Sequence, residues 1–203
     1  MRAIADYTAF MEAGETVVEL FRENMTPEPL GSPELISLCS PHESESNQLT
    51  VFLIHIEEDA QNVQAGYYQQ YGNVERASPS RFQLHFLVTA HSKAPAHMRE
   101  AEKYRILGRA VQVLKDNPVI PRHYLRGSLS DTNAELHISV ERPNFEQMAK
   151  LWNNTSVTYK LSVLCKVSSV EIDSKRERKT ARVTDIQIGV AEKSRALQKG
   201  KNR

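Results

Sequence analysis

The sequence predicts an α/β (α+β) fold in which a single mixed β-sheet is packed by two main helices and followed by an extended C-terminal arm. Three segments have the short, alternating pattern of β-strands: residues 49–57, 81–90 and 157–170. Two longer segments repeat apolar residues every three or four positions, as amphipathic helices do: residues 3–24 and 96–116. The chain turns basic after residue 173. We therefore expect a domain over residues 1–173 and a basic arm over residues 174–203.

Composition excludes several classes of protein. With 203 residues, of which 40% are hydrophobic and 25% charged, the chain is typical of a globular protein and not of a wholly disordered one. Its longest apolar run covers residues 51–54, whereas a membrane span needs about 20 residues. Acidic residues interrupt the N-terminal stretch where a secretory signal needs an apolar core. We therefore expect a protein that does not cross a bilayer and that is made and kept in the cytoplasm.

Cysteine and charge add two further expectations. Cys39 and Cys165 are too few for a disulfide framework and lack the paired spacing of a zinc site, so both are expected to be buried, reduced and structural. Residues 171–203 carry ten Lys and Arg against five Asp and Glu, a net charge of +5, which leaves −4 on residues 1–170. The basic character of the chain therefore lies in its tail.

The N-terminal third is predicted to contain a helix and a central strand. The helix over residues 3–24 is weakened by Gly14 and ends at the Thr-Pro-Glu-Pro segment 26–29. Its apolar face comprises Ile4, Tyr7, Met11, Val18 and Phe21. A short apolar piece at 35–38 and a polar loop at 40–48 follow. The strand over 49–57 is apolar on both faces, which is typical of a central strand.

The middle of the chain contains the strongest helix signal. Residues 58–80 form a long connection rich in Gln, Asn, Gly and Tyr, of the kind that carries function or disorder. The strand over 81–90 is expected to lie beside the first strand. The helix over 96–116 ends at Asn117 and Pro118, and Gly108 within it suggests close backbone packing. Its apolar stripe comprises Ala101, Tyr104, Leu107, Val111 and Leu114.

The C-terminal third is predicted to complete the sheet and then leave it. A turn-containing link, a strand and a short helix are expected at residues 125–129, 135–140 and 143–153. The last core strand, 157–170, has one apolar and one wet face. After the charge run 175–179, residues 181–190 alternate again as a lone strand, which would need a partner.

The sequence contains none of the common catalytic or phosphate-binding motifs, so we expect no enzyme activity and no cofactor or metal. His55 and His85 lie in candidate strands and could approach each other near Glu57 if the strands paired, although ordinary sheet histidines are the simpler interpretation. Ser128 follows a glycine but lacks the turn that would activate it as a nucleophile.

Two segments are candidate contact sites. Tyr67, Tyr68 and Tyr71 in the long connection could stack on bases or anchor a protein interface, and the scarcity of Lys and Arg around them favours protein. The basic tail is the other candidate. A nucleic-acid-binding module that uses this tail and the tyrosines is therefore the alternative function. The acidic residues interleaved in the tail argue against this alternative.

Several segments resemble tail-terminator, or cap, proteins of extracellular contractile injection systems of the antifeeding-prophage and virulence-cassette type, which are similar to phage tail terminators. The likeness covers roughly residues 1–174 and consists of packing and turn motifs. These are Gly31-Ser32-Pro33, the first helix, and residues 104–120, 125–129, 134–139, 151–152, 159–163 and 172–174. Residues 153–155 and the basic extension depart from the pattern.

The resemblance implies a structural protein that assembles as a six-fold ring on the distal end of an inner tube and its contractile sheath. Its partners would be itself, the tube protein and the sheath protein, with no membrane partner and no nucleic acid. It would be assembled in the bacterial cytoplasm into a particle that the cell releases. The arm, residues 175–190, is expected to pair as a strand between subunits. The candidate interface residues are Tyr67, Tyr68, Tyr71, Lys175, Arg176, Arg178, Lys179, Arg182, Ile186 and Ile188.

Overall fold

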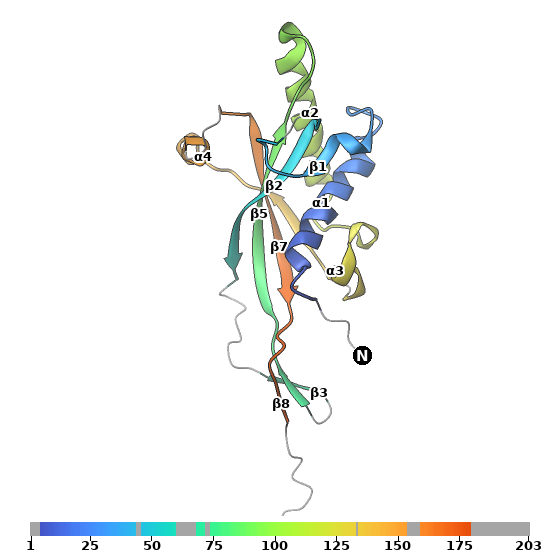
Figure 1. The fold of residues 1–203 in the computed structure, drawn as a ribbon, viewed down its shortest axis with the longest axis vertical. Helices are drawn as coiled ribbons and strands as arrows, with labels where there is room; N and C mark the ends of the chain where they lie inside the picture. The colour runs from blue at the N-terminus through green and yellow to red at the C-terminus, as the bar shows by residue number, and fades with distance from the viewer. Residues whose placement is uncertain are drawn as a thin grey trace, which may run out of the picture.

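A five-stranded mixed sheet forms the centre of the molecule, as the alternating segments predicted (Figure 1). The computed structural model describes residues 5–43, 46–59, 68–71, 74–132, 134–153 and 159–179. The strand order is β1-β2-β5-β7-β6, with β1 parallel to β2 and the other pairs antiparallel. The strands are β1 Ile36–Leu38, β2 Leu49–Glu58, β5 Ser80–Ala90, β6 His137–Val140 and β7 Ser162–Ile172. The expected central strand, β2, lies beside β5, as predicted.

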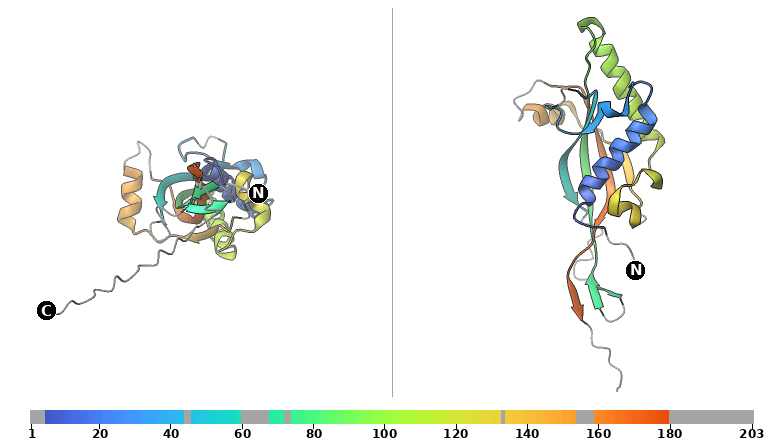
Figure 2. Two further views of the ribbon diagram at one scale, coloured as in Figure 1. Left: turned by 90° about the horizontal axis from the view of Figure 1, so that it is seen from below. Right: turned by 45° about the vertical axis from the view of Figure 1, so that its right-hand side comes forward.

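Two long helices cover one face of this sheet, and a shorter helix lies on the other side (Figures 1 and 2). The long helices are α1 Ala9–Met25 and α2 Ala96–Asp116. The shorter elements are α3 Gly127–Asp131, α4 Phe145–Asn153, and the 3-10 turns η1 Pro33–Leu35 and η3 Arg122–Tyr124. None of the described helices is long and apolar enough to cross a membrane.

The main core lies between α1, α2 and the sheet. Phe21 and Leu20 of α1 are fully buried against it, together with Phe86 of β5 and Cys165 of β7. The rings of Phe10 and Phe82 meet edge to face with their centroids 5.1 Å apart. Burial raises the pKa of the Cys165 thiol to about 12, so that it stays protonated at neutral pH.

The face that α1 buries differs from the expected one. Phe21 and Val18 are buried as predicted, but Tyr7 and Met11 are 74% and 51% exposed. Small residues make up much of the buried face, including Ala9, Ala13 and Gly14. A Cβ on Gly14 would lie 2.8 Å from Leu38 Cδ1, so Gly14 permits β1 to approach the helix rather than weakening it.

The stripe that α2 buries is likewise shifted. Leu107 and Leu114 are buried as predicted, together with Ile106, Ala110 and Val113, which the analysis of spacing missed. Tyr104 is 58% exposed because the N-terminal half of α2 projects past the end of the sheet (Figure 1). The close packing expected at Gly108 is wrong, since among the described residues no atom outside the backbone of α2 lies within 4 Å of a Cβ built there.

Leu107→Ala is expected to lower the free energy of unfolding by about 2–5 kcal/mol, because it leaves a cavity between α2 and the sheet. Chemical denaturation would measure this change. Tyr104→Ala on the exposed part of the same helix is the matched control and is expected to change stability by no more than about 0.5 kcal/mol. Equal stability of Leu107→Ala and the unaltered protein would contradict the packing described here.

Three further expectations need correction. Residues 127–131, which overlap the turn-containing link expected at 125–129, form α3. The last strand starts at Ser162 and breaks its alternation at Ser169, whose φ of 67° accompanies a register shift against β5, so Val170 is buried in place of residue 169. Cys39 is only half-buried.

Candidate functional site

A second, three-stranded sheet extends from the lower end of the main sheet (Figure 1). Its strands are β3 Tyr68–Tyr71, β4 Val74–Ala77 and β8 Glu177–Lys179, in the order β3-β4-β8. Both pairs are antiparallel. The sheet joins the long connection and the start of the arm, which were expected to be separate segments. We call it the distal sheet.

Opposite charges face each other across β4 and β8. Arg76 lies opposite Glu177 and the two form an ion pair. Glu75 lies opposite Arg178, with 2.5 Å between Arg178 Nε and Glu75 Oε2. The guanidinium of Arg178 also lies over the Tyr68 ring, 4.5 Å from its centroid. These cross-strand pairs favour the observed register over a slipped one.

The distal sheet brings some of the predicted interface residues together. Tyr68 and Tyr71 belong to β3, and Arg178 and Lys179 to β8, with Arg176 directly before it. Lys175 lies nearer the body, where its Nζ is 3.7 Å from Asp6 Oδ1. The other predicted residues lie outside the described residues: Tyr67, Arg182, Ile186 and Ile188.

Part of the charge run 175–179 belongs to the distal sheet, a pairing that the sequence did not predict. Residues 177–179 pair with β4 of the same chain, and the N–H of Ala77 donates to the carbonyl of Arg176 at 3.1 Å. The signal that could have revealed it is the charge alternation of residues 176–178, which complements that of Glu75 and Arg76 on an antiparallel partner. Whether residues 181–190 form a strand stays a prediction, because they lie outside the described residues.

Exposed apolar side chains occur at two places that the sequence analysis did not select. Met98 is 54% exposed on the projecting end of α2, and Phe145 is 81% exposed at the start of α4. The other side of α4 packs on the sheet, with Met148 and Trp152 buried against Leu87. The helix α4 is therefore amphipathic: one side packs on the sheet, and the other side faces solvent.

The two strand histidines approach each other as the sequence suggested. His55 and His85 face each other across β2 and β5, with ring centroids 5.3 Å apart. His85 Nδ1 is 2.9 Å from an oxygen of Glu141, and its Nε2 is 3.6 Å from an oxygen of Glu57. Glu57 was expected near these histidines from its position in the same strand as His55, whereas Glu141 was not. In the described part of the chain no three His, Cys, Asp or Glu residues are arranged to hold a metal ion.

Ser128 serves packing between α3 and α1. Its hydroxyl donates to Glu12 Oε2 at 2.6 Å and accepts from the N–H of Asp6 at 3.2 Å. Thr8 Oγ1 and the N–H of Leu129 also donate to the Glu12 carboxylate. Through these contacts the Ser128 hydroxyl links α3 to α1 and to the segment before it.

Glu12 is expected to make stability fall in acid. Burial raises the pKa of its carboxyl, but the hydrogen bonds from Ser128, Thr8 and Leu129 outweigh burial and hold the pKa below its ordinary value. A carboxyl whose pKa is lower in the folded state stabilises the protein at pH values above its unfolded-state pKa. This stabilisation is lost as the pH falls through the folded-state pKa.

Denaturation midpoints between about pH 6 and pH 3 would measure this loss. Glu12→Gln is expected to be less stable than the unaltered protein at neutral pH by about 1.5–3 kcal/mol and to lose less stability on acidification. Glu15→Gln, one turn on, is the control and should keep the full pH dependence. An unchanged pH profile in Glu12→Gln would contradict the assignment.

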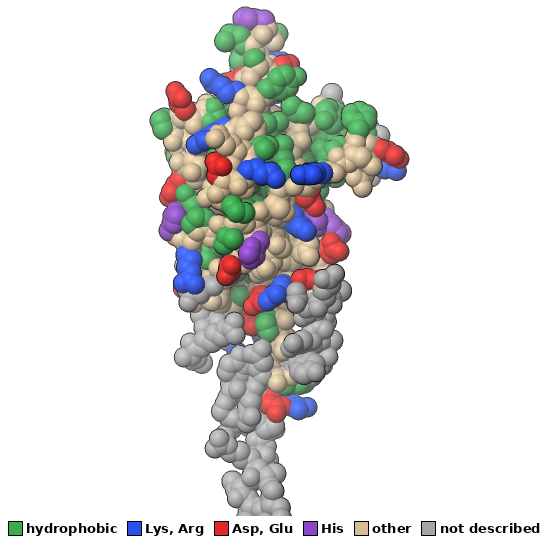
Figure 3. Space-filling view, turned by 180° about the vertical axis from the view of Figure 1, so that it is seen from behind, with side chains coloured by type: hydrophobic (Ala, Val, Ile, Leu, Met, Phe, Trp, Pro, Cys, Tyr) green, Lys and Arg blue, Asp and Glu red, His purple; other side chains and the backbone are tan. Residues whose placement is uncertain are grey.

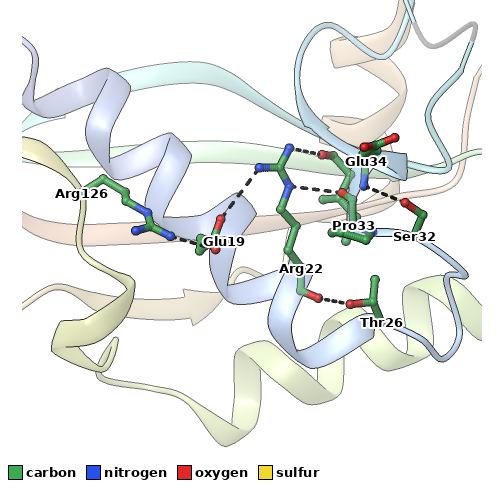
Figure 4. Close-up of polar contacts among 8 residues, drawn as sticks. Glu19, Arg22, Thr26, Ser32, Pro33, Glu34 and Arg126 are labelled. Carbon is green, nitrogen blue, oxygen red and sulfur yellow. Dashed lines mark hydrogen bonds and ion pairs between the residues drawn. The ribbon is translucent and has the colours of Figure 1, made fainter.

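A polar network joins α1 to the edge of the sheet (Figure 4). Arg22 donates from Nε to the carbonyl of Pro33 at 3.2 Å and from Nη2 to the carbonyl of Ile36 at 2.9 Å. Glu19 lies between Arg22 and Arg126, with 2.8 Å between its Oε1 and Arg126 Nη2. The network secures η1 and β1 to α1 through backbone carbonyls.

Comparison with known proteins finds a family and a fold. The model of a family described as the Pvc16 N-terminal domain matches residues 12–185. The fold is similar to a cryo-EM structure of the sheath/tube terminator of an extracellular contractile injection system, PVC, in its extended state, with a TM-score of 0.66 and 14% identity. It is also similar to the tube terminating cap of the anti-feeding prophage, with a TM-score of 0.62 and 16% identity.

These likenesses cover most of this chain and only part of the other proteins. The chain is covered to 93% and 88%, whereas it spans 65% of the PVC chain and 60% of the anti-feeding prophage chain. A comparison with curated protein sequences found no match.

Proposed function

The chain belongs to the Pvc16 N-terminal domain family, and we propose that it is a structural cap that ends the polymerisation of the tube and sheath of a phage-tail-like injection particle. The observation that carries this proposal is the fold shared over 93% of the chain with a protein described as a sheath/tube terminator. Its partners would be the tube and sheath proteins. The protein would be assembled in the bacterial cytoplasm and released with the particle.

The proposal includes a six-fold ring. A homomeric ring closes through head-to-tail contacts, so each subunit needs two different surfaces. The structure offers two projections at opposite ends of the body, the N-terminal half of α2 and the distal sheet (Figure 1). Tyr68, Tyr71, Arg178 and Lys179 belong to the distal sheet. The full set of interface residues proposed here is Tyr67, Tyr68, Tyr71, Lys175, Arg176, Arg178, Lys179, Arg182, Ile186 and Ile188.

A structural role agrees with how the polar groups are used. The hydroxyl of Ser128 and the imidazole of His85 each contact a carboxylate within the fold. The alternative of a nucleic-acid-binding module loses support. Arg76 on β4 and Arg178 on β8, which lie beside the tyrosines of β3, are paired with Glu177 and Glu75, so their charges are neutralised within the distal sheet.

The proposal is tested by producing the particle with and without this protein and measuring tube and sheath lengths by negative-stain electron microscopy. The expected result is a defined length with the protein present and a broad, longer distribution without it. The purified protein mixed with tube protein should also give rings with six-fold symmetry. Particles of normal length and stable sheaths in its absence would overturn the proposal.

A further inference from the structure

A basic pocket lies at the end of the sheet opposite the distal sheet, where β5 ends and α2 begins. Its volume is about 290 Å³, and it is lined by four cationic side chains together with His91. The cations are Lys93, Arg99, Lys103 and Lys160. Figure 3 shows Lys and Arg side chains on this face between the projecting end of α2 and α4.

Nearby carboxylates neutralise these cations only in part. Lys103 Nζ is 2.7 Å from Glu100 Oε1, at the exposed side of the helix. Glu102 accepts a hydrogen bond from Ser92. Lys160 Nζ donates to the carbonyl of Pro41 at 2.6 Å, which is a neutral partner. Among the described residues that line the pocket there is no Asp or Glu, so these residues concentrate positive charge there.

The pKa shifts of two half-buried groups in the pocket agree with this geometry. Burial, followed by the charges of Lys160 and Lys103, lowers the pKa of His91 to about 4, so the imidazole is neutral at physiological pH. Burial and the charge of Lys103 also lower the pKa of Lys160. Both groups therefore experience a positive potential that a bound anion would relieve.

We propose that this pocket binds a carboxylate-rich segment of another polypeptide. A cavity of about 290 Å³ holds one or two acidic side chains, and ammonium and guanidinium groups form short, strong hydrogen bonds with carboxylates. Nucleic acid fits less well. Its binding uses basic stripes with aromatic stacking surfaces. Of the described residues that line this pocket only His91 carries an aromatic ring, and residues 1–170 carry a net charge of −4.

The test uses the full chain and a fluorescein-labelled hexaglutamate peptide, with binding followed by fluorescence anisotropy at low and high salt. The unaltered protein is expected to bind the peptide and to lose affinity as salt screens the charges. The double variant Lys93→Gln, Arg99→Gln removes two exposed cations of the pocket and should bind about tenfold more weakly. Lys150→Gln on α4, whose Lys150 is paired with Glu146 at 2.7 Å, is the matched control and should bind as the unaltered protein does.

Three results would overturn the inference: no binding by the unaltered protein, equal binding by the double variant, or displacement of the peptide by a single-stranded oligonucleotide at lower concentration than by free hexaglutamate. A second readout is the NMR titration of His91, whose pKa should rise in the presence of hexaglutamate in the unaltered protein. The proposed capping function does not depend on this result. The peptide experiment measures binding to the isolated chain, whereas capping is tested by the lengths of tubes and sheaths.

Discussion

Phe86→Ala is expected to lower the free energy of unfolding by about 3–5 kcal/mol. Phe86 is 1% exposed and lies on β5 between Leu53 of β2 and Cys165 of β7. Its ring also reaches α1, where Cε1 lies 3.4 Å from the position a Cβ on Gly14 would take. Alanine at this position would leave a cavity where three strands meet the helix, with few neighbours able to close it.

Thermal and chemical denaturation of Phe86→Ala would measure the loss. Phe145→Ala is the matched control, because it deletes the same atoms from a side chain that is 81% exposed, and its stability should stay within about 0.5 kcal/mol of the unaltered protein. If the two variants were equally stable, the ring of Phe86 would not lie in the core described here.

Most elements of the body could be predicted from sequence because their patterns are long. The strands β2 and β5 and the helix α2 each repeat one period over several turns or alternations. The buried faces of α1 and α2 were harder to predict, since Ala9, Ala13 and Gly14 carry little hydrophobic signal and yet lie where the sheet approaches most closely. Tyr104 has a strong signal but lies on a part of α2 that passes beyond the sheet.

The distal sheet could not be predicted from local patterns, because its signal is the charge complementarity of two segments about 100 residues apart. Residues 68–71 and 74–77 are polar and lie among Gln, Asn and Gly, which are typical of loops. Their pairing depends on β8, about 100 residues later in the chain, whose charges complement those of β4. The basic pocket was missed for the same reason, since Lys160 precedes β7 and the other cations lie at 93–103.

Deleting residues 175–203 is expected to abolish capping while the body stays folded. Residues 175–178 are exposed, so their loss removes no part of the main core. Without β8, the strands β3 and β4 become a two-stranded hairpin, which is marginally stable in water. The distal sheet would lose Arg178, the surface around Tyr68 would lose its shape, and the tube and sheath would lose their defined ends. The deletion should leave the melting temperature of the body within a few degrees, about the effect of 1 kcal/mol or less.

Deleting only residues 180–203 separates the two parts of the arm, because it keeps β8 and its pairs with β4. If capping depends on the distal sheet, this shorter deletion retains it, whereas the longer one loses it; if both deletions lose it equally, the contact lies in residues 180–203 and strand addition by residues 181–190 gains support. Tube and sheath lengths in negative-stain images give the answer for both. Normal lengths with the longer deletion would show that neither the distal sheet nor the arm binds the partners, and unfolding of its body would show that residues 175–179 belong to the core of their own subunit.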